Sequence, residues 1–167
     1  LLARLRRITD GKIHAMKMRT HGDYHLGQVL YTGKDFVIID FEGEPARSLT
    51  ERRLKHSALR DVAGMVRSLH YAAYGTILLR SAKQGADVTY LERWAHVWYT
   101  YVSGVFLHDY VSTVGEAGFI PGDEKDFAVL LDTFLLEKAV YEAGYELNNR
   151  PEWLMIPIRG IEQILGK

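Results

Sequence analysis

Helical periodicity dominates the chain from residue 58 onward. Apolar residues recur every three or four positions there, a spacing that places them on one face of a helix. The predicted helices run from Ala58 or Leu59 to Ala82, from Thr89 to about Thr113, from Asp123 or Asp126 to about Leu147, and from Pro151 to about Leu165. Their apolar stripes comprise Leu59, Val62, Val66, Leu69, Ala73 and Ile77; Leu91, Trp94, Trp98, Tyr101 and Val105; and Phe127, Leu130, Leu131, Phe134, Leu135 and Tyr141.

Local signals predict the ends of these helices. Residues 84–85 (Gln-Gly) are expected to end the first helix. Thr89 is expected to cap the second, with Glu92 three residues later in the pattern of a capping box. Pro151 suits the first turn of the last helix, because the backbone N–H that proline lacks has no intrahelical partner there.

The remaining segments carry weaker signals. Residues 1–9 have helical spacing and are expected to end a helix, whereas residues 12–19 alternate weakly and are expected to be extended. The charged segment 44–57 lacks periodicity and is expected to be a surface loop. Residues 115–122 contain three glycines and are expected to form a turn region.

A small β-hairpin is predicted where the helical pattern is missing. Short apolar runs at residues 28–31 and 36–40 are joined by four residues that include Gly33, which favours a tight hairpin. A hairpin would bring Gln28 and Asp40, at its two open ends, close together. The predicted fold class is therefore mainly α with one small β-hairpin.

Composition places the chain among ordinary globular proteins. Its 167 residues, 47% hydrophobic and 25% charged, suffice for one domain with a buried core. The 21 basic and 21 acidic residues cancel, so no net charge points to nucleic acid or to an anionic membrane. The absence of Cys excludes thiolate and disulfide chemistry. No apolar run reaches the ~18 residues of a membrane span, and no signal-peptide pattern is seen, which is compatible with a cytoplasmic protein.

The candidate chemistry lies between residues 19 and 45. A Gly-containing loop, His21-Gly22-Asp23, is followed five residues later by Gln28 and, after an apolar run, by Asp40. Asp23 can orient a substrate hydroxyl and accept its proton, while Gln28 and Asp40 offer the oxygen ligands that Mg²⁺ prefers. Because phosphoryl transfer depends on positioning and on charge neutralisation by such a metal ion, the set suits a phosphoryl-transfer site.

Four blocks of sequence extend this order of residues. They are His21-Gly22-Asp23-Tyr24-His25-Leu26-Gly27-Gln28, Ile39-Asp40-Phe41-Glu42-Gly43-Glu44-Pro45-Ala46-Arg47, Leu59-Arg60-Asp61-Val62-Ala63-Gly64-Met65, and Asn149-Arg150-Pro151-Glu152-Trp153 followed by Ile156-Pro157. With these blocks the chain resembles the aminoglycoside-phosphotransferase-like kinases and, more closely, the maltokinases, including those fused behind trehalose synthase. Many kinases have Asn at the position of Gln28, whereas the maltokinase pattern is similar to the Gln version.

This resemblance implies an activity. It implies ATP-dependent phosphorylation of maltose at its anomeric hydroxyl, which gives maltose 1-phosphate for α-1,4-glucan synthesis. Asp23 would be the catalytic base, and Gln28 and Asp40 would bind Mg²⁺, with ATP as co-substrate. Maltose and ATP are therefore the expected partners, and neither nucleic acid nor a membrane is expected.

The resemblance also implies a domain organisation. Residues 1–167 would form the C-terminal lobe of a protein-kinase-like fold, with a catalytic and metal segment at 19–45 and a helical acceptor-binding subdomain at 58–167. No counterpart of the N-terminal lobe, with its β-strands and ATP-binding Lys, precedes residue 20, and the chain begins Leu-Leu-Ala rather than with Met. We therefore expect a fragment of a longer polypeptide, such as a trehalose synthase–maltokinase fusion, that would be inactive alone.

Several polar residues near the catalytic set have a structural interpretation beside a functional one. His21 is expected to structure its loop by hydrogen bonding, and His25 is ambiguous. Glu42 either assists the metal or substrate or fixes the loop. Asp61 follows Arg60 at the start of a helix and is expected to stabilise the positive end of that helix rather than to contact substrate.

Candidate acceptor-binding residues lie on the later helices. Trp98 is a candidate for stacking on a sugar ring, although aromatic residues at helical spacing more often belong to a core. Tyr141 and Tyr145 are four residues apart, and so are Glu142 and Glu146. This spacing places the two Glu side chains on one helix face, and likewise the two Tyr side chains. These residues either line a disaccharide site or form a solvated face. Two other functions stay open: a kinase for another alcohol, such as an aminoglycoside or choline, and a non-catalytic sugar-binding or structural lobe.

Overall fold

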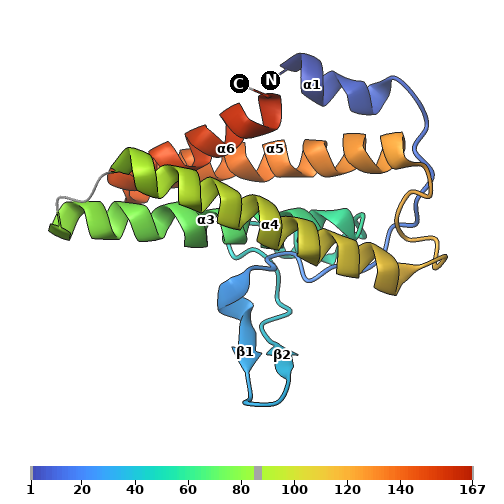
Figure 1. Ribbon diagram of the computed structural model, residues 1–167. Coiled ribbons are helices and arrows are strands. Elements are labelled where there is room, and N and C mark those ends of the chain that lie inside the picture. Colours follow the sequence, from blue (N-terminus) through green and yellow to red (C-terminus); the bar gives the residue numbers. More distant parts are fainter. Residues whose placement is uncertain (1, 85–87, 167) are drawn as a thin grey trace. The chain divides into compact units, whose positions relative to one another are not determined.

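The computed structural model describes residues 2–84 and 88–166, most of which are helical (Figure 1). The long helices are α3 (Leu59–Gln84), α4 (Val88–Val114) and α5 (Glu124–Asn149), followed by the 3₁₀ turn η3 (Pro151–Trp153) and α6 (Met155–Leu165). The short helices are α1 (Leu2–Arg6), η1 (Arg7–Thr9), η2 (Leu26–Gln28) and α2 (Leu49–Arg53). Two antiparallel strands, β1 (Val29–Tyr31) and β2 (Phe36–Ile38), form a sheet. The predicted class, mainly α with a small hairpin, is confirmed.

Two compact units divide the chain. The first comprises Leu1–Met65 and Glu116–Leu135, and the second comprises Val66–Gly115 and Leu136–Lys167. Helices α3 and α5 each run from the first unit into the second. No helix within residues 2–84 and 88–166 is both long enough and apolar enough to cross a membrane.

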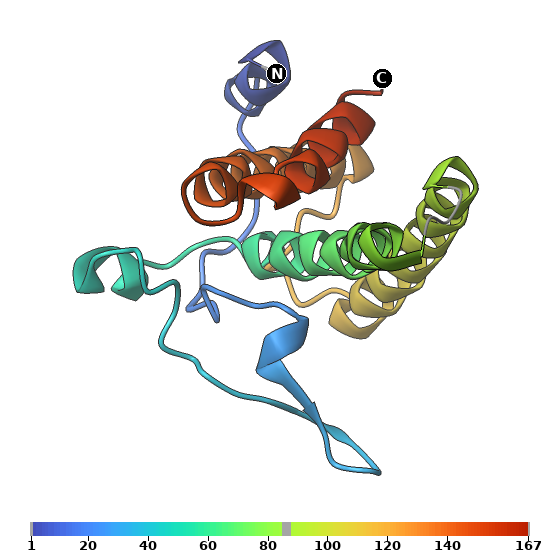
Figure 2. The same ribbon diagram turned by 90° about the vertical axis from the view of Figure 1, so that its left-hand side faces the viewer.

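The hairpin of the first unit has the predicted register. Val29 pairs with Ile38 and Tyr31 with Phe36, and Gly33 in the turn has a φ of 91°, which glycine adopts without strain. From β2 a long extended connection leads to α2 (Figure 2). Residues 12–19 have extended character at Met18, whose backbone pairs with that of His56 through two hydrogen bonds of 2.9 and 3.0 Å.

Helix α2 corrects the prediction of a loop over residues 44–57. The N–H of Glu51 donates to the Ser48 hydroxyl at 3.3 Å, and the N–H of Ser48 donates to the Glu51 carboxylate at 2.9 Å. This reciprocal pair is a capping box, which satisfies two N–H groups that would otherwise lack partners at the start of the helix. The missed signal was therefore the Ser-x-x-Glu spacing.

The ends of the long helices agree with the predictions to within a few residues, but one of the predicted caps is wrong. Asp123 caps α5, because its carboxylate accepts the N–H groups of Lys125 and Asp126 at 2.9 and 3.0 Å. Thr89 does not cap α4, since that helix already includes Val88. The predicted stop at Gly85 lies outside the described residues. Pro151 opens the 3₁₀ turn η3, and α6 follows it at Met155.

The face of α3 that was predicted to be buried is buried. On α4 the prediction is wrong, because most residues of the predicted apolar stripe are exposed. In the second unit, Ile77 of α3 packs in a core with Tyr74, Ala95 and Ile156. The side chains of Trp94, Trp98 and Tyr101, predicted to share a stripe on α4, are 59%, 45% and 73% exposed. Apolar residues occur almost all round α4, so spacing alone could not select the face that packs.

His70 is a fully buried titratable side chain in the second unit. Its ring centre lies 4.4 Å from that of Tyr74 and 4.9 Å from that of Tyr99. Burial, followed by the positive charge of Arg67, lowers the pKa of His70 from 6.5 to about 2, although a contact with Gln163 acts in the opposite direction. The imidazole is therefore neutral in the folded protein across the physiological range.

The low pKa of His70 predicts a loss of stability in mild acid. The unfolded chain takes up a proton at this residue below pH 6.5 and the folded chain does not, so the free energy of unfolding falls as the pH drops below that value. His70→Phe should abolish this contribution, which is about 1.4 kcal/mol per pH unit. Urea unfolding at pH 7.5 and 5.5 measures it, with His108→Phe at an exposed position of α4 as control. Equal pH dependence in His70→Phe and the unmodified protein would refute the assignment.

Candidate phosphoryl-transfer site

The His21–Asp23 loop in the first unit is anchored to the start of α3. Asp61, in the first turn of that helix, accepts the backbone N–H of His21 at 2.6 Å with one carboxylate oxygen and that of Gly22 at 2.9 Å with the other. Burial raises the pKa of Asp61, while these two hydrogen bonds act to lower it. Asp61 therefore fixes the backbone immediately before Asp23.

The His21 ring connects the same loop to the segment after β2. Its Nε2 lies 2.8 Å from the Ile39 carbonyl oxygen, and its Nδ1 lies 3.4 Å from the backbone N of Asp23. Because a carbonyl can only accept and an N–H can only donate, these contacts assign the proton of a neutral ring to Nε2. The ring also packs against Phe41, at 4.8 Å between centres. His21 thus occupies a structural position behind Asp23.

Asp23 lies at the surface of the loop, with 18% of its side chain exposed. The Nε2 atom of His25 is 3.7 Å from its Oδ2, and Nδ1 of the same ring accepts the N–H of Gly27 at 3.0 Å. The His25 proton is therefore assigned to Nε2, on the side that faces Asp23. His25 both caps η2 and adds a polar hydrogen beside the candidate base.

Gln28 and Asp40 meet at the open end of the hairpin. The side-chain amide nitrogen of Gln28 donates to Oδ2 of Asp40 at 2.8 Å, and the backbone N–H of Ile39 donates to the backbone carbonyl of Gln28 at 3.0 Å. The predicted proximity of these two residues is confirmed. Asp40 has a φ of 64°, a left-handed conformation that few residues other than Gly adopt. Backbone strain of this kind is concentrated at functional sites.

This pair fits a magnesium ion bound together with phosphates. No group of three or more His, Cys, Asp or Glu side chains suited to a metal is found among residues 2–84 and 88–166. Mg²⁺ does not require one, since it typically uses one or two carboxylates and completes its six ligands with phosphate and water oxygens. Asp40 supplies the carboxylate, and a rotation of the Gln28 amide would supply a neutral oxygen.

Two further predicted supporting residues lie around this loop. Glu42 is exposed, and its backbone carbonyl accepts from Arg52 at 3.5 Å. Arg60 is partly buried beside Asp61, where its positive charge acts to lower the pKa of that carboxyl.

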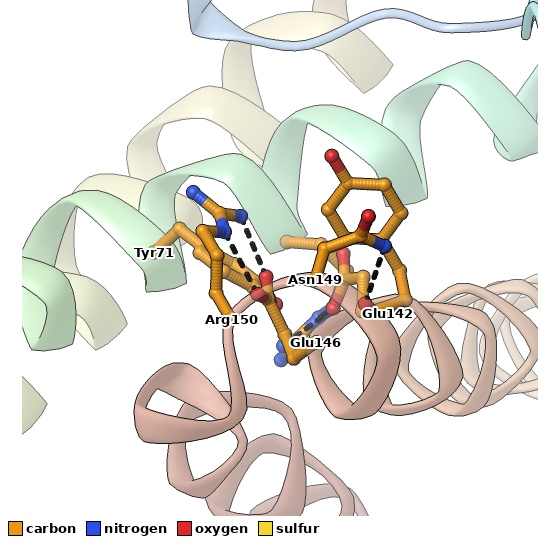
Figure 3. Close-up of polar contacts among 7 residues, drawn as sticks. Tyr71, Glu142, Glu146, Asn149 and Arg150 are labelled. Atoms are coloured by element: carbon orange, nitrogen blue, oxygen red, sulfur yellow. Dashed lines mark hydrogen bonds and ion pairs between the residues drawn. The ribbon is translucent and has the colours of Figure 1, made fainter.

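The second unit contains a buried pair of carboxylates on α5 (Figure 3). Glu146 is 1% exposed, and both of its oxygens are occupied. Oε1 accepts from Arg150 at 2.7 Å and from the Tyr71 hydroxyl at 3.0 Å, and Oε2 accepts from Arg150 at 2.9 Å. Burial, followed by the charge of Glu142, raises the pKa of Tyr71, so its hydroxyl stays protonated and can donate.

Glu142 is the more accessible member of this pair. Arg67 contacts a single oxygen, Oε2, through Nε at 2.9 Å and through Nη2 at 2.8 Å. The Glu142 side chain is 12% exposed and that of Arg67 only 1%. Burial raises the pKa of Glu142, while the adjacent Arg67 acts to lower it. Both contacts from Arg67 are made to Oε2, so Oε1 of Glu142 is the candidate acceptor for a ligand hydroxyl.

The three aromatic residues predicted to bind the acceptor together with these carboxylates do not share one environment. The Tyr141 ring lies 5.2 Å from the Lys138 ammonium, and the exposed Tyr145 ring lies 5.7 Å from the Arg150 guanidinium. Trp98 lies on α4 and contacts none of the four residues in the described interactions.

Sequence reasoning missed the arginines that hold the two carboxylates. Arg150 follows Glu146 by four residues, the spacing of a helical ion pair, so this partner was recognisable. Arg67 is a charged residue within an otherwise apolar buried run, which signals a buried ion pair without naming its partner. Glu142 lies 75 positions away, and only the fold brings the two together.

Comparison with known proteins indicates a relationship to sugar kinases. No protein-family model matches the chain. A glucosamine kinase of Streptacidiphilus jiangxiensis is 25% identical over 87% of this chain and 31% of its own length. A glucosamine kinase of Mycolicibacterium smegmatis is 29% identical over 88% of this chain and 34% of its own length. The chain thus spans about a third of the length of the curated relatives it matches.

Solved structures agree with this relationship. Crystal form A of a glucosamine kinase matches with a TM-score of 0.71 and 24% identity, over 90% of this chain and 35% of that one. A glucosamine kinase in complex with glucosamine, ADP and inorganic phosphate matches with a TM-score of 0.69, over 87% and 34%. The likeness shows that the chain has the fold of the matching part of these enzymes. The sequence similarity to the two glucosamine kinases supports a sugar-kinase-like protein in general and does not single out maltokinases.

Proposed function

We propose that this chain is the catalytic C-terminal lobe of an ATP-dependent sugar kinase. The observation that carries the proposal is the 2.8 Å contact between Gln28 and Asp40, the two predicted metal ligands, at the end of a strained hairpin. The loop of Asp23, held by Asp61 and His21, belongs to the same unit. The similarity to glucosamine kinases supports the same class of reaction.

In the proposed reaction a sugar hydroxyl attacks the γ-phosphorus of ATP. The Asp23 carboxylate orients this hydroxyl and accepts its proton as the new P–O bond forms and the bond to the β-phosphate oxygen breaks, releasing ADP. Gln28 and Asp40 would hold Mg²⁺, which supplies neutralisation of the phosphate charge. Asp61 keeps the loop backbone in place, so that Asp23 is positioned before the substrate arrives.

Two sugars are candidates for the acceptor. The four sequence blocks support maltose, with maltose 1-phosphate as product. The named relatives support glucosamine, which one matching structure contains. In either case we propose Oε1 of Glu142 as an acceptor for a sugar hydroxyl, because Oε2 is held by Arg67. Tyr141, Tyr145, Glu146 and Trp98 remain weaker candidates for the acceptor pocket.

A panel of acceptors tests the proposal in the full-length polypeptide. The polypeptide would be incubated with ATP, Mg²⁺ and, separately, maltose, glucosamine, an aminoglycoside and choline, and ³¹P NMR would identify each phosphorylated product. A sugar phosphate is expected, and an anomeric phosphate formed in the incubation with maltose would identify maltose as acceptor. Product with choline or an aminoglycoside alone would contradict the sugar class. Absence of every product from a folded polypeptide would favour a non-catalytic, sugar-binding or structural lobe.

Asp40→Asn should weaken the use of Mg²⁺ strongly. It removes the one negative charge that the chain is proposed to place on the metal, so the Mg²⁺ concentration for half-maximal activity should rise at least ~10-fold. Asp35→Asn, in the turn of the same hairpin, is the matched control, because Asp35 is exposed at the opposite end. An unchanged Mg²⁺ dependence in Asp40→Asn would exclude Asp40 as a ligand.

The remaining expectations concern the rest of the polypeptide. We propose that an N-terminal lobe supplies the other side of the nucleotide site, that a trehalose synthase domain is attached to it, and that the enzyme is cytoplasmic. On this proposal the 167-residue chain alone should bind Mg-ATP weakly or not at all. Isothermal titration measures this, and tight binding of ATP would refute the need for a second lobe.

A further inference from the structure

A cavity of 370 Å³ opens between α3 and α4 in the second unit. The two helices lie side by side along this part of the chain (Figure 1). Its lining consists of Ala72, Ala73, Thr76, Ile77 and Arg80 from α3 and Leu91, Trp94, Ala95 and Trp98 from α4. The volume lies within the range of small-molecule sites. None of these residues belongs to the loop of Asp23 or to the pair of carboxylates on α5.

The walls of this cavity are apolar and aromatic. Ile77 and Ala95 form its floor, since both are buried in the core of the second unit. Trp94 and Trp98 remain about half exposed although they are large aromatic side chains. Exposed indole rings beside a cavity offer a flat ligand two faces on which to stack. The shape therefore suits a ring-shaped apolar body.

The polar groups of the cavity are mainly hydrogen-bond donors, and the Thr76 hydroxyl oxygen is the one side-chain acceptor of the described lining. The Arg80 guanidinium and the two indole N–H groups can donate and cannot accept. The hydroxyl proton of Thr76 is already given to the Ala72 carbonyl, at 2.7 Å. The described lining contains no carboxylate, amide or imidazole side chain that could accept from a ligand hydroxyl. A neutral sugar would find a single side-chain acceptor, the Thr76 oxygen, for the protons of its several hydroxyls, whereas an anion needs donors only.

The charge at the cavity has the same sign as this donor pattern. Arg80 is the charged residue of the described lining, and it forms no ion pair with another described residue. Glu92 of α4 forms an ion pair with Arg159 of α6. A ligand anion would thus find an unneutralised guanidinium, which binds carboxylate and sulfonate groups through paired N–H donors.

We propose that this cavity binds a small aromatic anion, with the ring between Trp94 and Trp98 and the anionic group on Arg80. The proposal does not depend on the proposed sugar-kinase function. The assignment differs from the sugar stacking expected for Trp98, because stacking suits both ligands but the excess of donors and the positive charge of Arg80 suit the anion.

Indole NMR signals provide the test on the 167-residue chain. The sequence has three Trp residues, so ¹⁵N labelling gives three indole N–H peaks, of which that of Trp153 serves as internal reference. Naphthalene-2-sulfonate should shift the Trp94 and Trp98 peaks at saturable concentrations and move Trp153 much less. The uncharged naphthalene-2-sulfonamide, which has the same ring system, should bind at least fivefold more weakly. Equal shifts of all three peaks, or equal binding of the two compounds, would overturn the proposal.

Two variants assign the binding to this cavity. Arg80→Gln should weaken naphthalene-2-sulfonate binding about five- to tenfold and leave the sulfonamide unaffected. Arg93→Gln is its control, since Arg93 is an exposed arginine of α4 outside the lining. Trp98→Ala should abolish saturable shifts at Trp94, whereas Val97→Ala, at an exposed neighbouring position, should not. Unchanged binding in Arg80→Gln or in Trp98→Ala would refute the site.

Discussion

Asp23→Asn should lower kcat for phosphoryl transfer in the full-length polypeptide by about two to four orders of magnitude while the fold survives. The amide can still hydrogen-bond a hydroxyl but cannot accept its proton at neutral pH. The backbone around Asp23 is held by Asp61 and His21, neither of which is changed, so the loop should keep its conformation. KM for ATP should change little, because the proton acceptor is not proposed to bind the nucleotide.

Steady-state kinetics with the best acceptor of the panel measure this effect, and thermal unfolding confirms that the variant is folded. Asp10→Asn is a control with the same change of charge at an exposed position outside the loop of Asp23. A kcat within threefold of the unmodified enzyme would show that Asp23 is not the base. A loss of activity accompanied by a large drop in Tm would assign Asp23 a structural role instead.

The parts of this site that sequence could predict are local. Gln28 and Asp40 are joined by a short hairpin, and strand register fixed by a tight turn determines which residues face each other. The contact of Asp61 with the loop of Asp23 was not predictable in the same way. Its position in the first turn of α3 is visible in the sequence, but its two hydrogen bonds span 39 and 40 residues. Such a contact depends on the fold of the whole unit.

The helical part shows the same limit. The buried face of α3 was predictable because polar residues bound its apolar stripe, whereas α4 has apolar residues almost all round and its exposed tryptophans were assigned to the wrong face. The capping box of α2 was a local signal that was missed because the charged segment around it was interpreted as a loop. Packing between helices selects one apolar face among several, and periodicity alone contains no information about that choice.

Gly160→Ala should destabilise the second unit by about 3–5 kcal/mol, because it would break a buried ion pair. A Cβ added at Gly160 would overlap the Nη1 atom of Arg67 and lie 2.7 Å from its Cζ. Arg67 is 1% exposed, so its guanidinium has no free space into which it could move while keeping its contacts with Glu142. Displacement would leave two charges buried and unpaired.

Urea unfolding measures this loss, and Gly104→Ala provides the matched control. Nothing lies within 4 Å of a Cβ at Gly104 in α4, so alanine there should stabilise the helix by about 0.5–1 kcal/mol. The double variant Arg67→Met/Gly160→Ala tests the cause. If the clash with Arg67 is responsible, Gly160→Ala should cost much less once Met is present, and the two effects should be clearly non-additive. Additive effects would show that Gly160 is required for a reason other than the placement of Arg67 beside Glu142.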